Sequence, residues 1–428
     1  MGFFKTLFGR DWRKFKARGD DHLKDEEWGR ARGAFQEALR LFDGQEAERA
    51  TVEAQLAVAN ERLLRMHLGE AERFIDQDMM EKAAEHLQTA LDFVSGAEQR
   101  EDVLARISRL GASLAPDPAM APQDESVGLD DPFDEVETFL VHLSNLSPEQ
   151  ADAYETFGEG FRKAYLAMMS GQWEQAEALL MPIYERDSDN TFLQYELGRL
   201  RLGQERFAEA EALLSQACEK SPDSIPMRHD RIRALWQLED FATAERMVEA
   251  AFEIDDELLD NFAIAGETCL RSGEYENGVE IVEAGIALYG QSIALHRLLG
   301  KLEGARKNHR SALDAFETAL RLRWRFDYET GQLNFDIESA WLAANLYLAT
   351  RINLPRAEEL FRAMLASSDE GGRLAYLVGA GQAMMLQGDK KGARDFLVEA
   401  ASMAPEGSEV LDRIKAIMEG EQPPGDGA

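Results

Sequence analysis

Histidine, cysteine and carboxylate side chains are all present in this sequence, but their spacing predicts neither a catalytic site nor a metal site. The seven histidines form no His-Glu-x-x-His pattern, and none lies at metal-ligand spacing from a cysteine. Gly379-Ala380-Gly381 lacks the third glycine of a dinucleotide-binding loop. Cys218 and Cys269 fall at helical packing positions, where a small buried side chain is expected. We therefore expect no enzyme activity, no cofactor and no metal ion.

A second possible chemistry, contact with a membrane surface, is indicated by the basic and aromatic segment 1–16. Aromatic and aliphatic side chains recur there at helical spacing, beside several lysines and arginines, in an otherwise acidic chain. Such an amphipathic helix binds anionic lipid. The candidate membrane residues are Phe3, Phe4, Leu7 and Phe8. The alternative is that these side chains only cap the first helical repeat.

Composition limits the class of protein that this chain can be. Lys plus Arg number 47 and Asp plus Glu 80, which gives a net charge of −33 and excludes a general nucleic-acid binder. Hydrophobic residues make up 45%, enough for a folded chain. The chain has two cysteines and no apolar run of membrane-spanning length, so a reducing, cytoplasmic location is expected. Segment 1–16 adds the alternative of peripheral contact with the inner face of the membrane.

A repeat of 34 residues runs through the second half of the chain. Small residues recur at this interval in five copies: Ala176, Ala210, Ala244, Gly278 and Ala312. Large apolar residues follow four positions later: Leu180, Leu214, Val248, Val282 and Phe316. Two further copies, around Ala357 and Ala393, come after an 11-residue insertion. Small residues allow two antiparallel helices to approach closely, and large residues fill the groove to the next pair.

This pattern resembles the tetratricopeptide repeat (TPR) family. The resemblance implies an all-α fold, a right-handed helix-turn-helix repeat solenoid of about seven C-terminal units. Weaker copies around Gly19 to Ala38 and Ala71 to Ala90 imply a smaller, TPR-like helical bundle at the N-terminus.

The predicted domain boundaries follow from these repeats and from composition. The basic segment 1–16 overlaps an N-terminal helical domain at 12–111. An acidic, proline-rich stretch at 112–137 is expected to be a flexible linker. The C-terminal solenoid spans 138–419, with an insertion at 321–337, and a tail at 420–428 is expected to be disordered.

The resemblance also implies a binding surface, because TPR solenoids bind peptides on a concave face formed by the first helix of each unit. Read onto this sequence, that face contains Phe161, Tyr165, Met168, Phe192, Tyr195, Arg199, His229, Arg233, Trp236, Arg271, Arg297 and Lys301. Arginines bind carboxylates through paired N–H groups, and the aromatic residues add apolar area. The expected partner is therefore a protein or peptide with an acidic segment and an apolar anchor. The alternative for each cation is an ion pair with Asp or Glu on a neighbouring helix.

The insertion contains two more candidate partner-binding residues, Trp324 and Phe326. Apolar residues alternate with charged ones on both sides of Thr330-Gly331, a pattern typical of a β-hairpin. An extended helix followed by a loop is equally possible. Exposed tryptophan is typical of interfaces. The alternative is that these aromatic side chains fill the gap between two repeat units.

Three functions agree with these observations. The first is a non-catalytic scaffold or adaptor that binds an extended segment. The second is a membrane-associated assembly factor that uses the N-terminal aromatic residues as a peripheral anchor. The third is the regulatory subunit of an enzyme. The acidic linker, with Leu129, Phe133 and Val136, is a candidate for occupying the concave face in cis. The sequence does not define the oligomeric state.

Overall fold

A computed structural model describes residues 12–42, 44–77, 79–94, 96–113, 135–327, 332–367 and 371–419. The predicted all-α repeat solenoid is confirmed, with one short β-hairpin within the described residues. The described chain forms two compact units, 12–264 and 265–419, which divide within α15 (Leu259–Ser272). Each unit is described separately.

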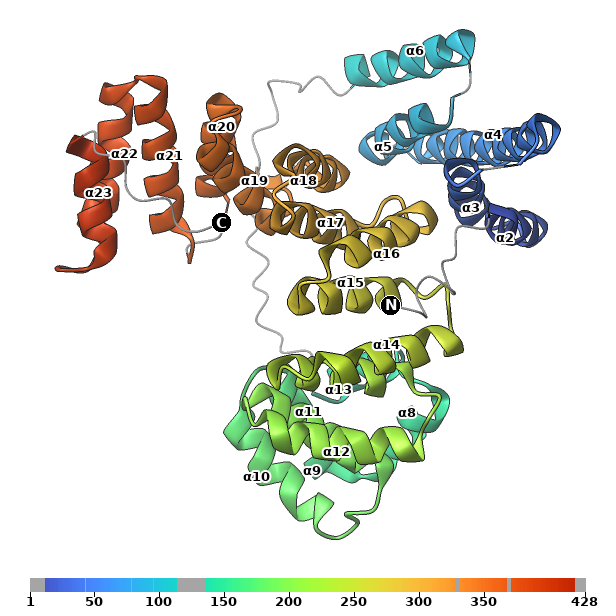
Figure 1. Cartoon of the computed structure of the whole chain (residues 1–428), viewed down its shortest axis with the longest axis vertical. Coiled ribbons are helices and arrows are strands. Elements are labelled where there is room, and N and C mark those ends of the chain that lie inside the picture. Colours follow the sequence, from blue (N-terminus) through green and yellow to red (C-terminus); the bar gives the residue numbers. More distant parts are fainter. Residues whose placement is uncertain are drawn as a thin grey trace. The chain divides into compact units, whose positions relative to one another are not determined.

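The first unit contains three consecutive helical hairpins, seen around α11 to α14 in Figure 1. We call the first helix of each hairpin the A helix and the second the B helix. The hairpins are α9 (Gly158–Met169) with α10 (Trp173–Tyr184), α11 (Thr191–Gly203) with α12 (Phe207–Lys220), and α13 (Ile225–Gln237) with α14 (Phe241–Ile254). They are preceded by α7 (Glu135–Leu143) and α8 (Pro148–Thr156).

The second unit continues the same alternation of A and B helices. Its elements after α15 are α16 (Tyr275–Leu288), α17 (Ile293–Ala305), α18 (His309–Arg323), β1 (Arg325–Asp327), β2 (Gln332–Asn334), α19 (Ile337–Thr350), α20 (Leu354–Leu365), α21 (Arg373–Gln387), α22 (Lys390–Met403) and α23 (Glu409–Glu419). The last helix buries Ile414 and Ile417 against the helices before it, as expected for a terminal cap.

The 34-residue period of the sequence reappears in the helix boundaries and in the core. Five successive B helices begin 34 residues apart, at Trp173, Phe207, Phe241, Tyr275 and His309. The first residue of each of these helices is tryptophan, phenylalanine or tyrosine in four cases and histidine in the fifth. The predicted small residues lie at the crossing of each A and B helix, and the four alanines among them are fully buried.

The A helices and the turns repeat with the same period. The A helices α11, α13, α15 and α17 begin 34 residues apart. Each turn between an A helix and its B helix contains one residue with positive φ, again at steps of 34. These residues are Gly171, Glu205, Glu239, Gly273 and Lys307. The turn geometry therefore repeats even where the residue is not glycine.

The insertion forms the β-hairpin, which was one of the two conformations expected from the sequence. β1 and β2 pair antiparallel, with Arg325 opposite Asn334 and Phe326 opposite Leu333. The hairpin lies between α18 and α19, so the next repeat begins later along the chain without a break in helix packing. Residues 328–331, which include the expected turn, lie outside the described residues.

The N-terminal part of the first unit is a helical domain with one unusually long helix. Its helices are α2 (Trp12–Lys24), α3 (Trp28–Arg40), α4 (Glu46–Asp76), α5 (Met80–Ala90) and α6 (Ala97–Ser113), with a short 3₁₀ helix at Leu91–Phe93. Gly19 lies directly against the ring of Phe35, as expected for a close helix crossing. The 31-residue α4 explains the wide spacing of the two N-terminal repeats, because it packs against α3 and then against α5.

Two histidines form a contact between α4 and α5. Nδ1 of His67 lies 3.1 Å from Nδ1 of His86, and His67 stacks on Phe93 with ring centroids 5.4 Å apart. Burial lowers the pKa of His67 below its ordinary value of 6.5, and the neighbouring His86 lowers it further. The carboxylates of Glu70 and Asp92 oppose this shift in part.

This pair predicts a loss of stability in mild acid. Because the pKa of His67 is lower in the folded state, the unfolded chain takes up the proton first as pH falls. The contribution of His67 to stability is therefore complete above about pH 6.5 and decreases below it. In an NMR titration, we expect His67 to titrate below 6.5 and His86→Asn to raise its pKa. An unchanged titration of His67 in His86→Asn would contradict this account.

Candidate functional site

The predicted binding residues of the first unit lie together on the A helices α9, α11 and α13. We call this surface the inner face and define it by Phe161, Tyr165, Met168, Phe192, Tyr195, Arg199, His229, Arg233 and Trp236. Most of these side chains are buried, and Phe192, Arg199 and Arg233 retain more exposure. The inner face is therefore a largely packed surface.

The helices α7 and α8 bury the N-terminal part of the inner face. Phe139 of α7 lies 5.6 Å from Tyr165 and 6.5 Å from Phe161, measured between ring centroids. Tyr154 of α8 lies 4.8 Å from Phe161 and 6.1 Å from Phe192. This is why Phe161 and Tyr165 are buried: α7 and α8 lie across the A-helix positions that the resemblance assigns to ligand binding.

A buried carboxylate connects α8 to the inner face. The hydroxyl group of Tyr154 donates a hydrogen bond to Oε1 of Glu196, whose side chain is fully buried. Glu196 also accepts hydrogen bonds from Nη1 of Arg199, at 3.1 Å and 3.0 Å. Burial raises the pKa of Tyr154, and the charge of Glu196 raises it further. Tyr154 therefore remains a hydrogen-bond donor at physiological pH.

A second carboxylate, Asp230 of α13, extends this network across the A helices. Tyr195 donates to Asp230 at 2.8 Å, and Nε of Arg199 lies 3.6 Å from the same carboxylate. Arg233 also donates to Asp230, and about half of its side chain is exposed. The charge of Glu196 raises the pKa of Arg199, which stays fully charged. Two arginines and two carboxylates thus balance within one cluster.

The remaining inner-face residues of α13 have structural contacts. Nε2 of His229 lies 2.7 Å from Oδ1 of Asn261, and Nδ2 of Asn261 donates to two backbone carbonyls, those of Ala251 and Asp255. Burial lowers the pKa of His229, so the neutral ring is favoured. Trp236 is 9% exposed, and Met168 on α9 is 4% exposed, so neither side chain presents a large contact area.

The predicted cations of the second unit are also ion-paired. Arg271 contacts Glu267 at 2.8 Å. Nη1 of Arg297 donates to both oxygens of Asp336, at 2.8 Å and 2.9 Å, and Lys301 contacts Glu338. Burial alone would raise the pKa of Asp336, but hydrogen bonds from Ser339 and Arg297 hold it below its usual value. Intramolecular pairing, which was the alternative expected from the sequence, is therefore observed for every predicted cation on the A helices.

Trp324, predicted as a partner-binding residue, packs within the second unit. Its ring lies 5.1 Å from that of Phe335, and the guanidinium group of Arg356 lies 5.3 Å from its centroid. The side chain is half-buried against the core formed by α18 to α21. Filling of the gap between two repeats thus accounts for this residue. The side chain of Phe326 lies outside the described part of the chain.

This packing predicts that Trp324 matters for stability. We expect Trp324→Ala to lower the free energy of unfolding by about 2 kcal/mol, because a half-buried aromatic side chain is removed from the hairpin junction. Thermal unfolding of the full chain, followed by circular dichroism, measures this loss. Ile352→Ala is a suitable control, since Ile352 is 61% exposed. Equal melting temperatures for the two variants would favour an interface role for Trp324.

Several predicted features lie outside the described residues. These are the membrane candidates Phe3, Phe4, Leu7 and Phe8, the linker residues 114–134, and the tail 420–428. Among the described residues, no helix combines the length and hydropathy required of a membrane-spanning segment. Within the same residues, no group of three or more histidine, cysteine or acidic side chains is arranged for metal binding. Cys218 and Cys269 are buried as expected, and burial raises the pKa of Cys218 to about 11.

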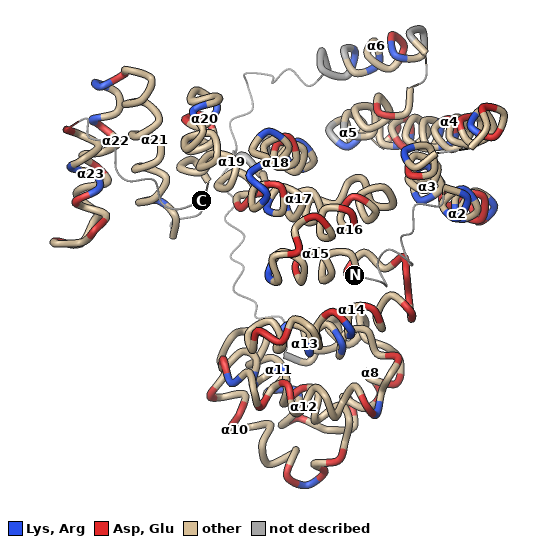
Figure 2. Tube along the Cα trace, viewed as in Figure 1, with Lys and Arg blue, Asp and Glu red and all other residues tan. Residues whose placement is uncertain are grey.

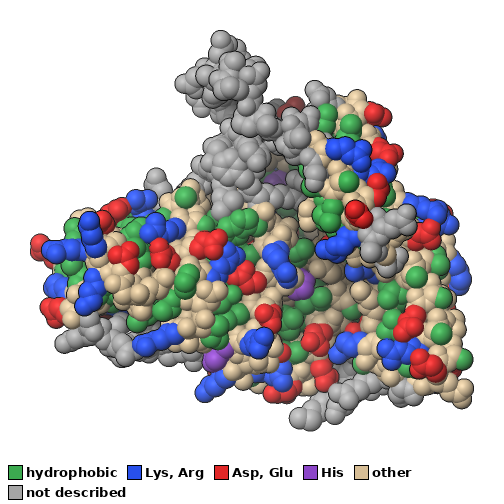
Figure 3. All heavy atoms as spheres, turned by 90° about the horizontal axis from the view of Figure 1, so that it is seen from above, with side chains coloured by type: hydrophobic (Ala, Val, Ile, Leu, Met, Phe, Trp, Pro, Cys, Tyr) green, Lys and Arg blue, Asp and Glu red, His purple; other side chains and the backbone are tan. Residues whose placement is uncertain are grey.

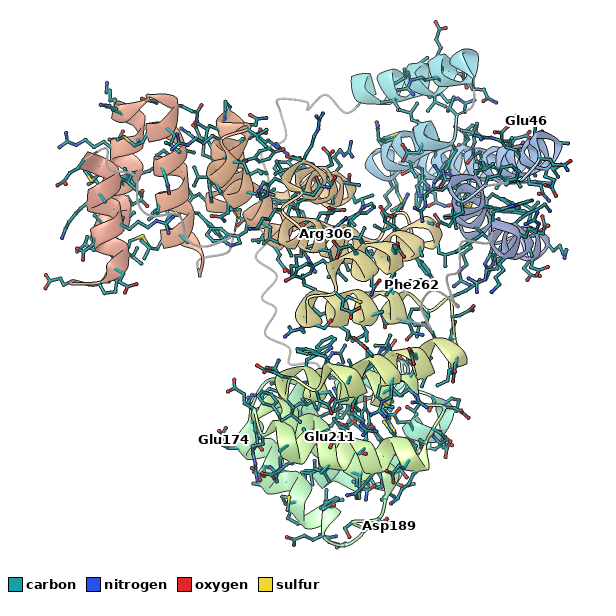
Figure 4. All side chains as sticks on the ribbon, viewed as in Figure 1. Glu46, Glu174, Asp189, Glu211, Phe262 and Arg306 are labelled. Atoms are coloured by element: carbon teal, nitrogen blue, oxygen red, sulfur yellow. The ribbon has the colours of Figure 1, made fainter. Side chains whose placement is uncertain are left out.

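Acidic and basic side chains are interspersed over the repeats. Figure 2 shows both signs of charge along α12, α13 and α14. On the face shown in Figure 3, neither sign forms one continuous patch. Glu211 of α12, labelled in Figure 4, accepts hydrogen bonds from Arg231 of α13 at 3.1 Å and 2.8 Å. Local pairing of this kind reduces the long-range attraction of the basic residues for an acidic partner.

Sequence reasoning missed the residues that organise the inner face: Phe139, Tyr154, Glu196 and Asp230. Acidic side chains usually lie on solvated helix faces, but Glu196 is fully buried. One signal was available, because Glu196 and Asp230 are 34 residues apart and therefore occupy the same position in successive repeats. Phe139 and Tyr154 lie outside the repeat register.

Comparison with known proteins agrees with this geometry. The profile of the family described as "Tetratricopeptide repeat" matches residues 167–230, from the end of α9 into α13. This part of the chain is therefore similar to tetratricopeptide repeats. The matched residues include Glu196, Arg199 and Asp230 of the buried network, whereas Tyr154 and Arg233 lie outside the match. No curated protein matches the chain.

Several solved structures are similar to this chain at low identity. A TPR protein from Parabacteroides merdae ATCC 43184 is 17% identical, with 62% of this chain and 99% of that chain covered and a TM-score of 0.44. Yeast Tom70 is 14% identical, with 95% of each chain covered and a TM-score of 0.47. PilF of Pseudomonas aeruginosa is 17% identical, with 54% and 99% covered and a TM-score of 0.41.

Proposed function

We propose that this TPR protein is a non-catalytic scaffold that binds a segment of another protein on its inner face. The main support for this proposal is a cluster of hydrogen-bonded side chains that lies beside aromatic side chains on the successive A helices α11 and α13. The cluster consists of Tyr195, Arg199, Asp230 and Arg233. Arginine and tyrosine are common anchors of protein interfaces. The network fixes these side chains before a partner binds, which lowers the entropy cost of binding.

An acidic residue of the partner would bind at Arg233. One nitrogen of its guanidinium group donates to Asp230, while about half of the side chain stays exposed, so a further carboxylate can approach without breaking this pair. The cluster itself is neutral, because two carboxylates balance the two arginines. We therefore propose that apolar contact supplies most of the affinity, and that salt weakens binding only slightly.

Affinity capture from a lysate of the source cells tests this proposal. The inner-face variant is Arg233→Gln, which leaves Asp230 paired with Arg199 and Tyr195. The matched control is Arg246→Gln on the B helix α14, where Arg246 is exposed and donates to Thr243. We expect a protein that is captured by the wild type and by Arg246→Gln, and is reduced with Arg233→Gln. Equal capture by all three proteins, with circular dichroism showing intact folds, would contradict the proposed surface.

A further inference from the structure

The helices α7 and α8 resemble a bound ligand in the way that they contact the repeats. Phe139 and Leu143, four residues apart on α7, are both buried in the same core as Phe161 and Tyr165. Tyr154 of α8 adds a hydrogen bond to the buried Glu196 on α11. An amphipathic helix that binds in a groove uses anchors at this spacing. The surface that we propose for a partner is thus already occupied by residues 135–156.

The outward side of α7 is also apolar. Leu140 is 48% exposed and Val141 is 60% exposed. A helix that only ended a solenoid would present a polar outer face to solvent. Exposed aliphatic side chains on α7 are better explained if this helix exchanges between two environments.

The connection between α8 and the repeats allows such an exchange. α8 ends at Thr156, and α9 begins at Gly158, which has a φ of +82°. A Cβ atom built at Gly158 would meet no other group within 4 Å. Glycine adopts this left-handed conformation without strain and leaves other conformations accessible. The turn is therefore a suitable pivot for residues 135–156.

We propose that residues 135–156 are an internal ligand of the inner face, which a partner helix must displace. The proposal rests on the proposed function of this face. From the present occupant, the partner is an amphipathic helix with an aromatic residue and a leucine-like residue four positions apart. The short connection to α9 holds the internal ligand at high effective concentration. The apparent affinity for the partner is therefore the intrinsic affinity multiplied by the fraction of molecules in which the inner face is open.

A peptide made from residues 135–156 of this chain tests the proposal without an identified partner. The opened protein is the full chain with Phe139→Ala and Leu143→Ala. The control carries Leu140→Ala and Val141→Ala on the exposed side of the same helix. By fluorescence anisotropy, we expect the labelled peptide to bind the opened protein at least about tenfold more tightly than the wild type or the control. Equal affinities for the three proteins, or no binding to any, would overturn the proposal.

Amide hydrogen exchange of the wild type provides a test that needs no variant. If α7 and α8 detach as a unit, their amides exchange at least about tenfold faster than those of α11 and α13 after correction for intrinsic rates. Exchange of α7 and α8 as slow as that of α11 would overturn the internal-ligand proposal, even if the opened protein failed to fold.

The two proposals fail in different ways. If the peptide does not bind the opened protein but capture still depends on Arg233, the inner face binds a partner and residues 135–156 are only structural. If the peptide binds but capture does not depend on Arg233, the groove is confirmed as a helix-binding surface and the proposed contact at Arg233 is wrong.

Discussion

Glu196→Ala is expected to lower the free energy of unfolding of the first unit by about 3–5 kcal/mol, because it removes one partner of a buried ion pair. Arg199 would lose its hydrogen bonds to Glu196, and Tyr154 would lose the acceptor of its hydroxyl group. Asp230 would remain 3.6 Å from Arg199 and would compensate only in part. Chemical denaturation, with tryptophan fluorescence as the signal, measures the loss.

The control for Glu196→Ala is Glu159→Ala on α9. Glu159 is exposed and pairs with Lys163 at 2.8 Å, so its removal is expected to have little effect. Tyr154→Phe separates the two contributions of Glu196, since it removes only the hydrogen bond from α8. We expect Tyr154→Phe to cost less than Glu196→Ala. Similar stabilities for Glu196→Ala and the wild type would contradict the buried network.

Gly300→Val is expected to destabilise the second unit by about 3 kcal/mol, because it overpacks a helix crossing. A Cβ atom at Gly300 would lie 2.4 Å from Cε1 of Phe316 on the paired B helix. Phe316 is itself buried in the core of the second unit and cannot easily move away. Position 300 requires a small residue for this reason.

Gly304 on the same helix offers a matched control. A Cβ atom there would meet nothing within 4 Å. We expect Gly304→Val to change stability by less than about 0.5 kcal/mol, since valine and glycine differ little in helix propensity. Thermal unfolding by calorimetry compares the two variants. If both valine variants unfolded at the same temperature, close packing at Gly300 would not be the reason for its small side chain.

The repeat fold could be predicted because its determinants are local and periodic. The small residues from Ala176 to Ala312 mark helix crossings directly, and the alternation around Trp324 gave the hairpin as one of two possible conformations. Each of these signals depends on neighbours within one or two helices. A 34-residue register therefore carries over to the structure with little change.

The candidate site could be predicted only in part, since its main contacts are not periodic. Tyr154 and Glu196 are 42 residues apart, and no repeat position relates them. The position of Arg199 on the A helix was predicted, but its pairing with Glu196 and Asp230 depends on side-chain geometry. The packing of Phe139 onto Phe161 and Tyr165 likewise required the three-dimensional arrangement.

Site-specific photo-crosslinking tests most directly whether the inner face binds a protein partner. A benzophenone amino acid replaces the partly exposed Phe192 on the A helix α11 in one protein and the exposed Arg246 on the B helix α14 in another, so that Arg233 stays in place in both. Both proteins are irradiated in the source cells. Binding on the inner face predicts a crosslinked protein from position 192 and little or none from position 246. A crosslink from position 246 alone, or equal crosslinks from both positions, would contradict the proposed binding surface.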